Sequence, residues 1–326
     1  MRTNQNPRIG VILIVLLSFV LAACSGLGSP ATQEVTEPVT LRIAVLPILD
    51  ALPMYVADQE GLFEEQGIEV EFTPVASAAE RDQVITAGQA DGMINDGIST
   101  LLYNQDQPVI QVVRFARTAT AENPQYFILA AGQSGIDSVE GLKGVDIGVS
   151  QGTVIEYLVD RLLQAEGFSQ EEIQTIAVPG IADRMSLLAS GELEAAMLPD
   201  PLASLAVQNG AMVVLDDSSH PEFGYSLISF RKAVTDEHPE AVRGFLAAVE
   251  EATNRINANP DQWEGVLVEN NLVPAPLQGS YQIPPYPAAS NLSEAQWEDV
   301  LSWAQEEGLV SKDLAYADSV NSSFLP

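Results

Sequence analysis

The sequence contains few of the residues on which most catalytic and nucleic-acid sites depend. Its 326 residues include one cysteine, two histidines and 14 lysines and arginines, against 45 acidic residues, which gives a formal net charge of −31. A single cysteine excludes a disulfide within the chain. Clustered cations are needed to bind phosphates, so nucleic acid is not an expected partner.

Several motifs of common enzymes are missing as well. His220 and His238 do not stand in an HExxH, another paired metal spacing or a GxSxG elbow, and the chain has no Walker lysine loop and no GxGxxG. We therefore expect no catalytic residue, no metal and no cofactor. A solvated acidic exterior explains the net charge as solubility, although a negative potential could also favour a cationic or zwitterionic ligand.

The amino end has the pattern of a secretory signal. Arg2 and Arg8 precede an apolar run over residues 9–23, which predicts a signal peptide at 1–23. The run ends in Leu21-Ala22-Ala23-Cys24, which resembles the bacterial lipobox, whose cysteine becomes the lipidated first residue. Residues 24–39, rich in Gly, Ser, Thr and Pro, suit a flexible linker. No later run approaches the roughly 18 apolar residues of a membrane span, so we expect a soluble body tethered by Cys24 outside the cytoplasm.

The stretch from Leu41 to Met93 organises the rest of the chain. The apolar run Ile43–Leu46 ends in the loop Pro47–Asp50, a helix follows up to Gly61, and Ile68–Phe72 alternates as a second strand. Ser77 and Glu80 form a capping-box pattern that opens a second helix. In such a βαβα unit ligands bind beyond the carboxyl ends of parallel strands, so these loops should face one cleft.

This stretch is similar to the start of periplasmic-binding-protein-like solute receptors of the nitrate, sulfonate and thiamine-precursor type, the SsuA/THI5-like or NMT1 family. The matching segments are MYVADQEGLFEEQGIEVEF and AGQADGM; GIDSVEGLKGVDIGVSQGT and the closing LAYADSVNSSFLP also resemble the family. The resemblance implies a type II two-lobed α/β fold, a monomer that captures a small solute, and an ABC permease and ATPase as partners. Related THI5-like enzymes use a cysteine-rich segment, which this chain lacks.

The strand and helix rhythm predicts where the lobes divide. We assign the first part of lobe one to 40–125, lobe two to 126–230 and the second part of lobe one, with the carboxyl-terminal helices, to 231–326. Tyr126–Ala131 and Tyr225–Phe230 are the expected crossings between lobes. LASGELEAAML in the second lobe echoes TAGQADGMIN in the first, which indicates related architectures. The Pro-rich passage Val273–Pro287 cannot be a regular helix and is expected as a surface strap.

Candidate ligand-binding residues follow the predicted strands of both lobes. Helix amino termini hold anions and ring acceptors through free N–H groups. Carboxylates accept hydrogen bonds from amine or amidine-like ring edges, and arginines grip anions. The candidates of these kinds are Asp50, Ser77, Arg81, Asn95, Asp96, Arg117, Ser150, Gln151, Gly152, Thr153, Arg184 and Asp200.

Each candidate also has an ordinary structural interpretation. Asp50 could be a turn residue, Thr153, Asp96 and Asp200 could be helix caps, and each arginine could be an ion-pair partner. Tyr55, Tyr103 and Tyr157 could stack on a ring or pack in the core. Within the ligand classes that the resemblance implies, we expect a small nitrogen heterocycle, such as a thiamine pyrimidine precursor or similar vitamin. A sulfonate or nitrate anion is the alternative if the three arginines converge.

Overall fold

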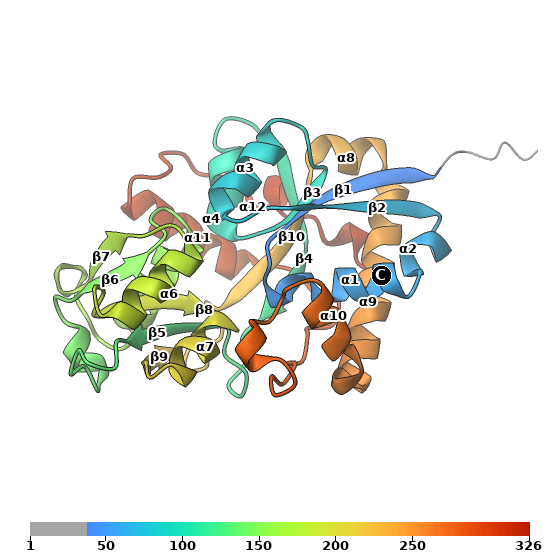
Figure 1. Ribbon diagram of the computed structural model, residues 1–326. Coiled ribbons are helices and arrows are strands. Elements are labelled where there is room, and N and C mark those ends of the chain that lie inside the picture. Colours follow the sequence, from blue (N-terminus) through green and yellow to red (C-terminus); the bar gives the residue numbers. More distant parts are fainter. Residues whose placement is uncertain (1–37) are drawn as a thin grey trace, which may run out of the picture. The chain divides into compact units, whose positions relative to one another are not determined.

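The structure, a computed structural model, describes residues 38–326. The predicted signal peptide at 1–23, Cys24 and nearly all of the predicted linker 24–39 lie outside these residues. The described chain forms two five-stranded mixed sheets flanked by helices, which make up two α/β lobes (Figure 1). The expected fold class is confirmed.

The first sheet belongs to lobe one. Its β1 pairs in parallel with β2 and β3, and β10 pairs antiparallel with β3 and β4. In spatial order the strands are β2 (Ile68–Pro74), β1 (Val39–Val45), β3 (Gly92–Asn95), β10 (Tyr225–Arg231) and β4 (Ile110–Thr118).

The second sheet repeats this plan in lobe two. Its β6 pairs in parallel with β7 and β8, and β5 pairs antiparallel with β8 and β9. The order is β7 (Gln174–Ala177), β6 (Asp146–Val149), β8 (Ala195–Pro199), β5 (Tyr126–Ala130) and β9 (Met212–Asp216). The same strand plan in both sheets agrees with the sequence echo between the lobes.

Helices follow most of the strands. The α-helices are α1 (Leu52–Gln59), α2 (Leu62–Glu65), α3 (Ala78–Thr86), α4 (Gly97–Asn104), α5 (Val154–Ala165), α6 (Ile181–Ser190), α7 (Leu202–Gln208), α8 (Lys232–Glu237), α9 (Pro239–Ala258), α10 (Glu264–Glu269), α11 (Glu294–Glu306) and α12 (Tyr316–Ser319). The 3-10 turns are η1 (Leu49–Ala51), η2 (Val139–Leu142), η3 (Gln170–Glu172), η4 (Pro260–Trp263), η5 (Ala275–Leu277) and η6 (Ser322–Phe324). Among residues 38–326, no helix combines the length and apolarity that a membrane crossing needs.

The predicted βαβα unit is present as β1, α1, β2 and α3. Gly61, at φ 71°, separates α1 from the short α2, in a conformation that favours glycine. The Ser77 hydroxyl accepts the Glu80 N–H at 3.2 Å, whereas the Glu80 carboxylate reaches back to the Ala76 N–H at 2.8 Å. The amino terminus of α3 is therefore capped by Ser77, as the sequence indicated.

The passages between the lobes differ from the expected ones. Strand β5 pairs only within the second sheet, and β10 pairs only within the first. The chain therefore crosses at residues 119–125 and 217–224, directly before these strands. The two crossings are tied together, because Ala119 N–H donates to the Gly224 carbonyl at 2.7 Å and Gln125 N–H donates to Asp217 Oδ1 at 2.8 Å. Strand β10, placed in lobe two from the sequence, belongs to the sheet of lobe one.

Helix α11, one of the carboxyl-terminal helices, contacts both lobes. Val300 packs within 3.1 Å of the position that a Cβ would take on Gly97 of α4 in lobe one. On the same helix, Trp303 Nε1 donates to Asp160 of α5 in lobe two at 2.7 Å. Residues of both lobes share the apolar cluster around α11, so this helix joins the lobes.

Candidate ligand-binding cleft

A cavity of about 610 Å³ lies between the two sheets, at the carboxyl ends of β1, β2 and β3 in lobe one and of β6, β7 and β8 in lobe two. This is within the size range of small-molecule sites. All twelve predicted residues line it: Asp50, Ser77, Arg81, Asn95, Asp96, Arg117, Ser150, Gln151, Gly152, Thr153, Arg184 and Asp200. Loops that are far apart in the sequence therefore meet at one cavity, as expected at the carboxyl ends of parallel strands.

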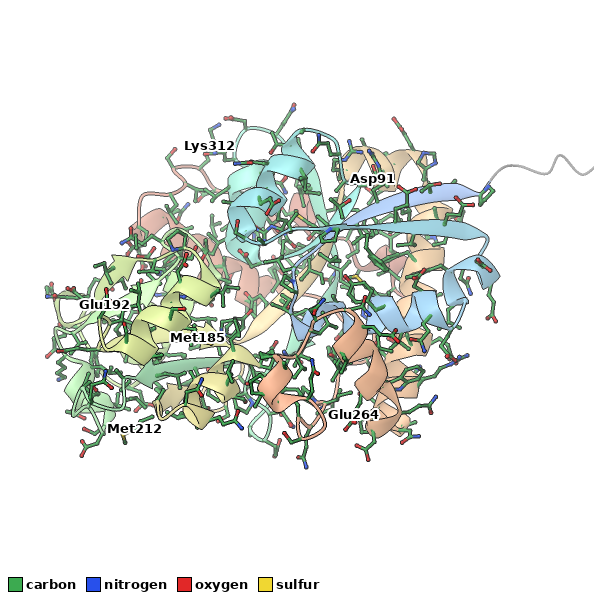
Figure 2. All side chains as sticks on the ribbon, in the orientation of Figure 1. Asp91, Met185, Glu192, Met212, Glu264 and Lys312 are labelled. Carbon is green, nitrogen blue, oxygen red and sulfur yellow. The ribbon has the colours of Figure 1, made fainter. Side chains whose placement is uncertain are left out.

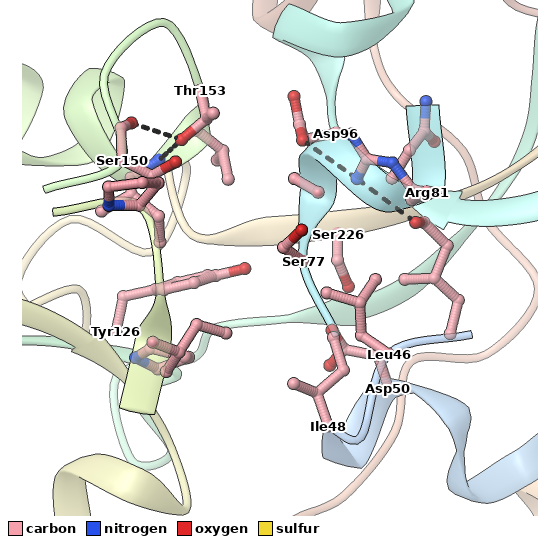
Figure 3. A pocket seen from close by; sticks show the side chains of 18 of the residues that line it. Leu46, Ile48, Asp50, Ser77, Arg81, Asp96, Tyr126, Ser150, Thr153 and Ser226 are labelled. Atoms are coloured by element: carbon pink, nitrogen blue, oxygen red, sulfur yellow. Dashed lines mark hydrogen bonds and ion pairs between the residues drawn. The ribbon is translucent and has the colours of Figure 1, made fainter. Parts of the chain in front are cut away.

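The two walls of the cavity carry different chemistry. In Figure 3, Tyr126, Ser150 and Thr153 of lobe two face Asp96, Arg81 and Asp50 of lobe one across an open space. Lobe one thus supplies charged side chains, and lobe two supplies mainly hydroxyl and aromatic groups to the part of the cleft drawn there.

Asp96 and Arg81 form a buried pair in the wall of lobe one. Asp96 follows β3 and caps α4, with Oδ1 accepting the Ser99 N–H at 2.8 Å, while Oδ2 lies 3.7 Å from Arg81 Nη1. Burial raises the pKa of Asp96, and the Arg81 charge acts against this. Arg81 also donates to Asp82 at 2.8 Å. The cap predicted for Asp96 is present, and Oδ2 keeps room for another donor.

Asp50 and Arg117 form a second buried pair. Asp50 lies in η1 and Arg117 near the end of β4, with 3.5 Å between Oδ1 and Nη1. Burial raises the pKa of Asp50, opposed by Arg117 and by Ser226. Burial lowers the pKa of Arg117, but the Asp50 charge and other anionic groups outweigh it, so its pKa is raised overall. Each of these two arginines therefore has a carboxylate beside it.

Arg184 on α6 has no carboxylate partner among the described residues. It is fully buried and donates to three carbonyls, those of Met197 at 3.0 Å, Val178 at 2.8 Å and Pro179 at 3.2 Å. Its Nη2 has no hydrogen-bond partner within residues 38–326, and burial lowers its pKa to about 10. The three arginines line one cavity, but each is held by a different set of protein groups.

The helix amino terminus predicted as an anion site, that of α5, is partly satisfied by the protein. The Thr153 hydroxyl accepts the Ile155 N–H at 3.2 Å and donates to the Ser150 carbonyl at 2.6 Å. The Gly152 N–H donates to the Glu156 carboxylate at 2.7 Å. The cap interpretation of Thr153 is therefore correct, and two N–H groups of this turn, those of Gly152 and Ile155, already have protein partners.

Two further predicted residues are already engaged. The Asn95 amide donates to Ser99 and Thr100 and accepts from Ser229 at 2.7 Å, so its polar atoms are used within lobe one. Asp200, after β8, accepts from the backbone and hydroxyl of Ser204 and from the Tyr281 hydroxyl. Asp200 lines the cavity, but both of its oxygens have protein partners.

The sequence did not single out the aromatic residue of the cavity. Tyr126 is at the start of β5, and Figure 3 shows its ring lying along the cavity with the hydroxyl directed toward lobe one. An aromatic residue directly after a crossing between lobes is the signal that could have identified it. The other lining residues that were not predicted are mostly apolar or small, namely Leu46, Ile48, Ala78, Ala79, Ile94, Val154, Ile155, Pro179, Gly180, Ile181 and Pro199, and three are polar, namely Asp82, Gln125 and Ser226.

The three tyrosines considered from the sequence are absent from the cavity lining. Tyr55 packs on Phe72 with ring centroids 4.7 Å apart, Tyr103 donates to Asp82 at 3.0 Å, and Tyr157 donates to Asp299 at 2.7 Å. Their structural interpretation is therefore correct. The position of a tyrosine in a predicted helix does not show whether its side chain packs in the core or lies at the helix end that lines the cleft.

Two α/β lobes with a ligand-sized cavity between their strand ends define the periplasmic-binding-protein class. Residues 49–263 match the family model described as NMT1/THI5 like, which is more than half of the chain. The chain therefore belongs to the NMT1/THI5-like family, as the sequence motifs indicated.

Relatives and solved structures agree with this assignment. A provisionally named thiamine biosynthesis protein of Haemophilus influenzae is 26% identical over 93% of this chain and 96% of its own length. The formylaminopyrimidine-binding protein of Halalkalibacterium halodurans is 21% identical over 96% and 98%.

Among solved structures, the alkanesulfonate-binding protein SsuA of Xanthomonas axonopodis pv. citri, bound to MOPS, has a TM-score of 0.73 at 18% identity, covering 88% of this chain and 99% of its own. The desulfurization enzyme DSZB has a TM-score of 0.65 at 15% identity, covering 88% and 97%. At these identities the structures establish the shared fold.

Proposed function

We propose that this protein is the solute-binding component of an ABC importer and that it captures a small nitrogen heterocycle, such as an aminopyrimidine, between its lobes. Membership of the NMT1/THI5-like family and the fold support the receptor class, and the formylaminopyrimidine-binding relative supports the ligand class. Residues of both lobes line one cavity, so closing the lobes on the ligand would shield it from water.

The observation that carries the ligand class is the position of Asp96. Its carboxylate lines the cavity, is buried, and has Oδ2 no nearer than 3.7 Å to Arg81. A buried carboxylate oxygen with spare acceptor capacity suits the N–H groups of an aminopyrimidine edge. Burial raises the pKa of this carboxyl group, and the arginine charge beside it opposes that shift and favours the ionised form.

The remainder of the cavity suits a flat ring. Leu46, Ile48, Ile155 and Ile181 supply apolar surface, and Tyr126 offers an aromatic face for stacking. The neighbouring Asp50 is paired with Arg117, so the two lobe-one ion pairs leave little unbalanced charge for a strongly anionic ligand. This division of apolar and polar groups is typical of small-molecule sites.

Calorimetry with a simple aminopyrimidine and an alkanesulfonate tests the ligand class. We expect the aminopyrimidine to bind more tightly and Asp96→Asn to weaken it about tenfold or more, because the amide replaces an acceptor with a donor and removes the charge. Asp183→Asn is the matched control, since Asp183 is an exposed acid on α6 outside the cavity lining. It should change the affinity little.

Tighter binding of the alkanesulfonate than of the aminopyrimidine would indicate an anionic ligand. A sulfonate or nitrate reading would be supported if substitution of Arg81, Arg117 or Arg184 abolished binding of the alkanesulfonate while Asp96→Asn bound normally. The observation in favour of this second candidate is Arg184, whose charge has no carboxylate beside it among the described residues. The likeness to a sulfonate-binding structure concerns the fold.

The proposal includes an extracytoplasmic location, a lipid anchor at Cys24, a monomeric state and no catalytic role. The signal-like residues 1–23 and the lipobox-like Leu21-Ala22-Ala23-Cys24 support the anchor. A THI5-like enzyme is the alternative of another class. The desulfurization enzyme DSZB has the same fold, so the fold is compatible with catalysis. The single cysteine of the chain disfavours the THI5-like chemistry.

A further inference from the structure

The Pro-rich segment 273–287, called the strap here, runs between α10 and α11 and contacts both lobes. Its ends belong to lobe one, where Val273, Leu277 and Tyr286 are part of the same apolar cluster as the strands and helices of that lobe. Figure 1 shows this orange segment extending from α10 toward α7 of lobe two. Its middle part is therefore the part that can connect the lobes.

The carboxyl end of the strap is fixed to lobe one by several hydrogen bonds. The Tyr286 hydroxyl donates to the Leu49 carbonyl at 2.7 Å, and the Asn257 amide of α9 bonds both the N–H and the carbonyl of Tyr286 at 2.9 Å each. Arg114 Nη2 donates to the Pro287 carbonyl at 3.0 Å. The carboxyl end of the strap is therefore attached to lobe one, and a side chain of the strap can contact lobe two from there.

Tyr281 is the side chain that reaches lobe two. Its hydroxyl donates to Asp200 Oδ2, and Asp200 Oδ1 accepts from the Ser204 hydroxyl and N–H of α7. Asp200 is 8% exposed and lines the ligand cavity. The strap and the cavity thus meet at this one carboxylate.

Apolar contacts accompany this hydrogen bond. Tyr281 and Ile283 join the same cluster as Leu202 and Leu205 of α7. Met185 of α6 packs against this cluster and also against the core of lobe two, and Figure 2 shows it where the lobes meet. Residues of the strap and of α7 therefore share apolar packing in addition to the hydrogen bond.

We propose that Tyr281 of the strap and Asp200 of lobe two form a latch that holds the two lobes together on one side of the ligand cavity. A hydroxyl donated to a buried carboxylate is a charge-assisted bond and among the stronger ones in proteins. Hinge motion at residues 119–125 and 217–224 would separate the fixed strap from lobe two, and the latch opposes that motion. Asp200 thereby acts as a positioning residue, and not as a direct acceptor for the ligand.

The role of the latch in retaining a solute rests on the proposed function, but the latch itself can be measured without ligand. The full chain carrying Cys24→Ser, Gln83→Cys and Gln174→Cys would be labelled with a donor and acceptor dye pair. Gln83 on α3 and Gln174 on β7 are exposed residues of different lobes. Single-molecule energy transfer between them reports the ratio of open to closed molecules.

We expect Tyr281→Phe to raise the open-to-closed ratio about tenfold, as loss of one hydrogen bond to a charged group would do. Tyr103→Phe is the matched control, because its hydroxyl also donates to a carboxylate, that of Asp82, but within lobe one and outside the strap. It should leave the ratio unchanged and lower the midpoint of thermal unfolding. Asp200→Asn should shift the ratio in the same direction, and combining it with Tyr281→Phe should add little.

An unchanged ratio in Tyr281→Phe, or equal shifts in Tyr281→Phe and Tyr103→Phe, would overturn the latch. Additive effects of Tyr281→Phe and Asp200→Asn would also contradict it, because two partners of one bond cannot act independently. No ligand is added in this experiment, so failure of an aminopyrimidine to bind would count against the proposed function and leave the latch standing.

Discussion

At the scale of single residues, the three buried arginines of the cleft differ in the groups that neutralise them. Arg81 and Arg117 each lie near an aspartate of lobe one, whereas Arg184 donates to backbone carbonyls at the ends of β7 and β8. Arg184 donates hydrogen bonds to three backbone carbonyls, and its removal would leave those acceptors unpaired. We therefore infer that its main role is to stabilise lobe two. The same residue type therefore has different roles within one cavity.

We expect Arg184→Gln to reduce stability more than ligand affinity. The free energy of unfolding should fall by about 2–4 kcal/mol, since the shorter amide cannot reach all three carbonyls, while the affinity for an aminopyrimidine should change less than about tenfold. Urea denaturation and calorimetry would measure the two quantities. Lys232→Gln removes a charge from an exposed pair with Asp236 and should cost about 0.5 kcal/mol or less. A stable Arg184→Gln protein without ligand affinity would contradict this role.

At the scale of elements, helix α11 is held to α5 of lobe two by hydrogen bonds between buried and half-buried polar groups. Trp303 Nε1 donates to Asp160 at 2.7 Å, and Asp299 accepts from Tyr157 at 2.7 Å and Arg161 at 3.2 Å. Burial raises the pKa of Asp160 to about 6, although the Trp303 hydrogen bond opposes the shift. The contact between α11 and α5 therefore carries a carboxyl group that holds its proton up to a higher pH than an exposed aspartate does.

This shift predicts a pH dependence of stability. The pKa of Asp160 is higher in the folded protein, at about 6, than its ordinary value of 3.8, so the folded state holds the proton more tightly. The contribution of protonated Asp160 to the free energy of unfolding is then fully present below about pH 4. It falls as the pH rises toward 6 and is lost above pH 6. Burial of Asp217 also raises its pKa to about 6, which adds a change of the same sign.

We expect Asp160→Asn to unfold with nearly the parent free energy at pH 4 and to exceed the parent by up to about 3 kcal/mol at pH 8. Asparagine can still accept from Trp303 but does not titrate. Urea denaturation at pH 4, 6 and 8 would measure the difference. Asp261→Asn, at an exposed position of η4, is the control and should show no such trend. A difference that does not grow with pH would be inconsistent with the raised pKa.

At the scale of the whole molecule, the sequence predicted the positions of the site loops better than their contacts. Strand ends were readable because alternating or continuous apolar runs stop at polar residues such as Asn95, Ser150 and Asp200. The topological rule then placed these loops at one cleft, and the cavity lining includes every predicted residue.

The contacts themselves depend on tertiary packing and could not be read from local patterns. Nothing near Asp50 in the sequence points to Arg117, and nothing near Asp200 points to Tyr281 of the strap. Strand β10 was placed in lobe two because its apolar pattern fits either sheet, and only its pairing with β3 and β4 decides. Whether these residues bind a ligand stays a prediction.

The proposed membrane anchor determines where the whole molecule is located, and it depends on the sulfur atom of Cys24. If Cys24 is acylated, Cys24→Ser should move the protein from the membrane fraction to the soluble extracytoplasmic fraction, because lipid chains supply the membrane affinity. Fractionation with immunodetection would measure the distribution. A Cys24→Ser protein that remains in the membrane fraction with residues 1–23 removed would contradict the lipobox interpretation.

The central claim is that the cleft between the lobes holds one small solute, and native mass spectrometry of the full chain tests it most directly. We expect one added mass of a small molecule per chain, either retained through purification or after mixing with a panel of aminopyrimidines, vitamins and alkanesulfonates. Asp96→Asn should lose this adduct while keeping the charge-state distribution of a folded protein. A folded parent protein that shows only its own mass with every compound of the panel would contradict the account.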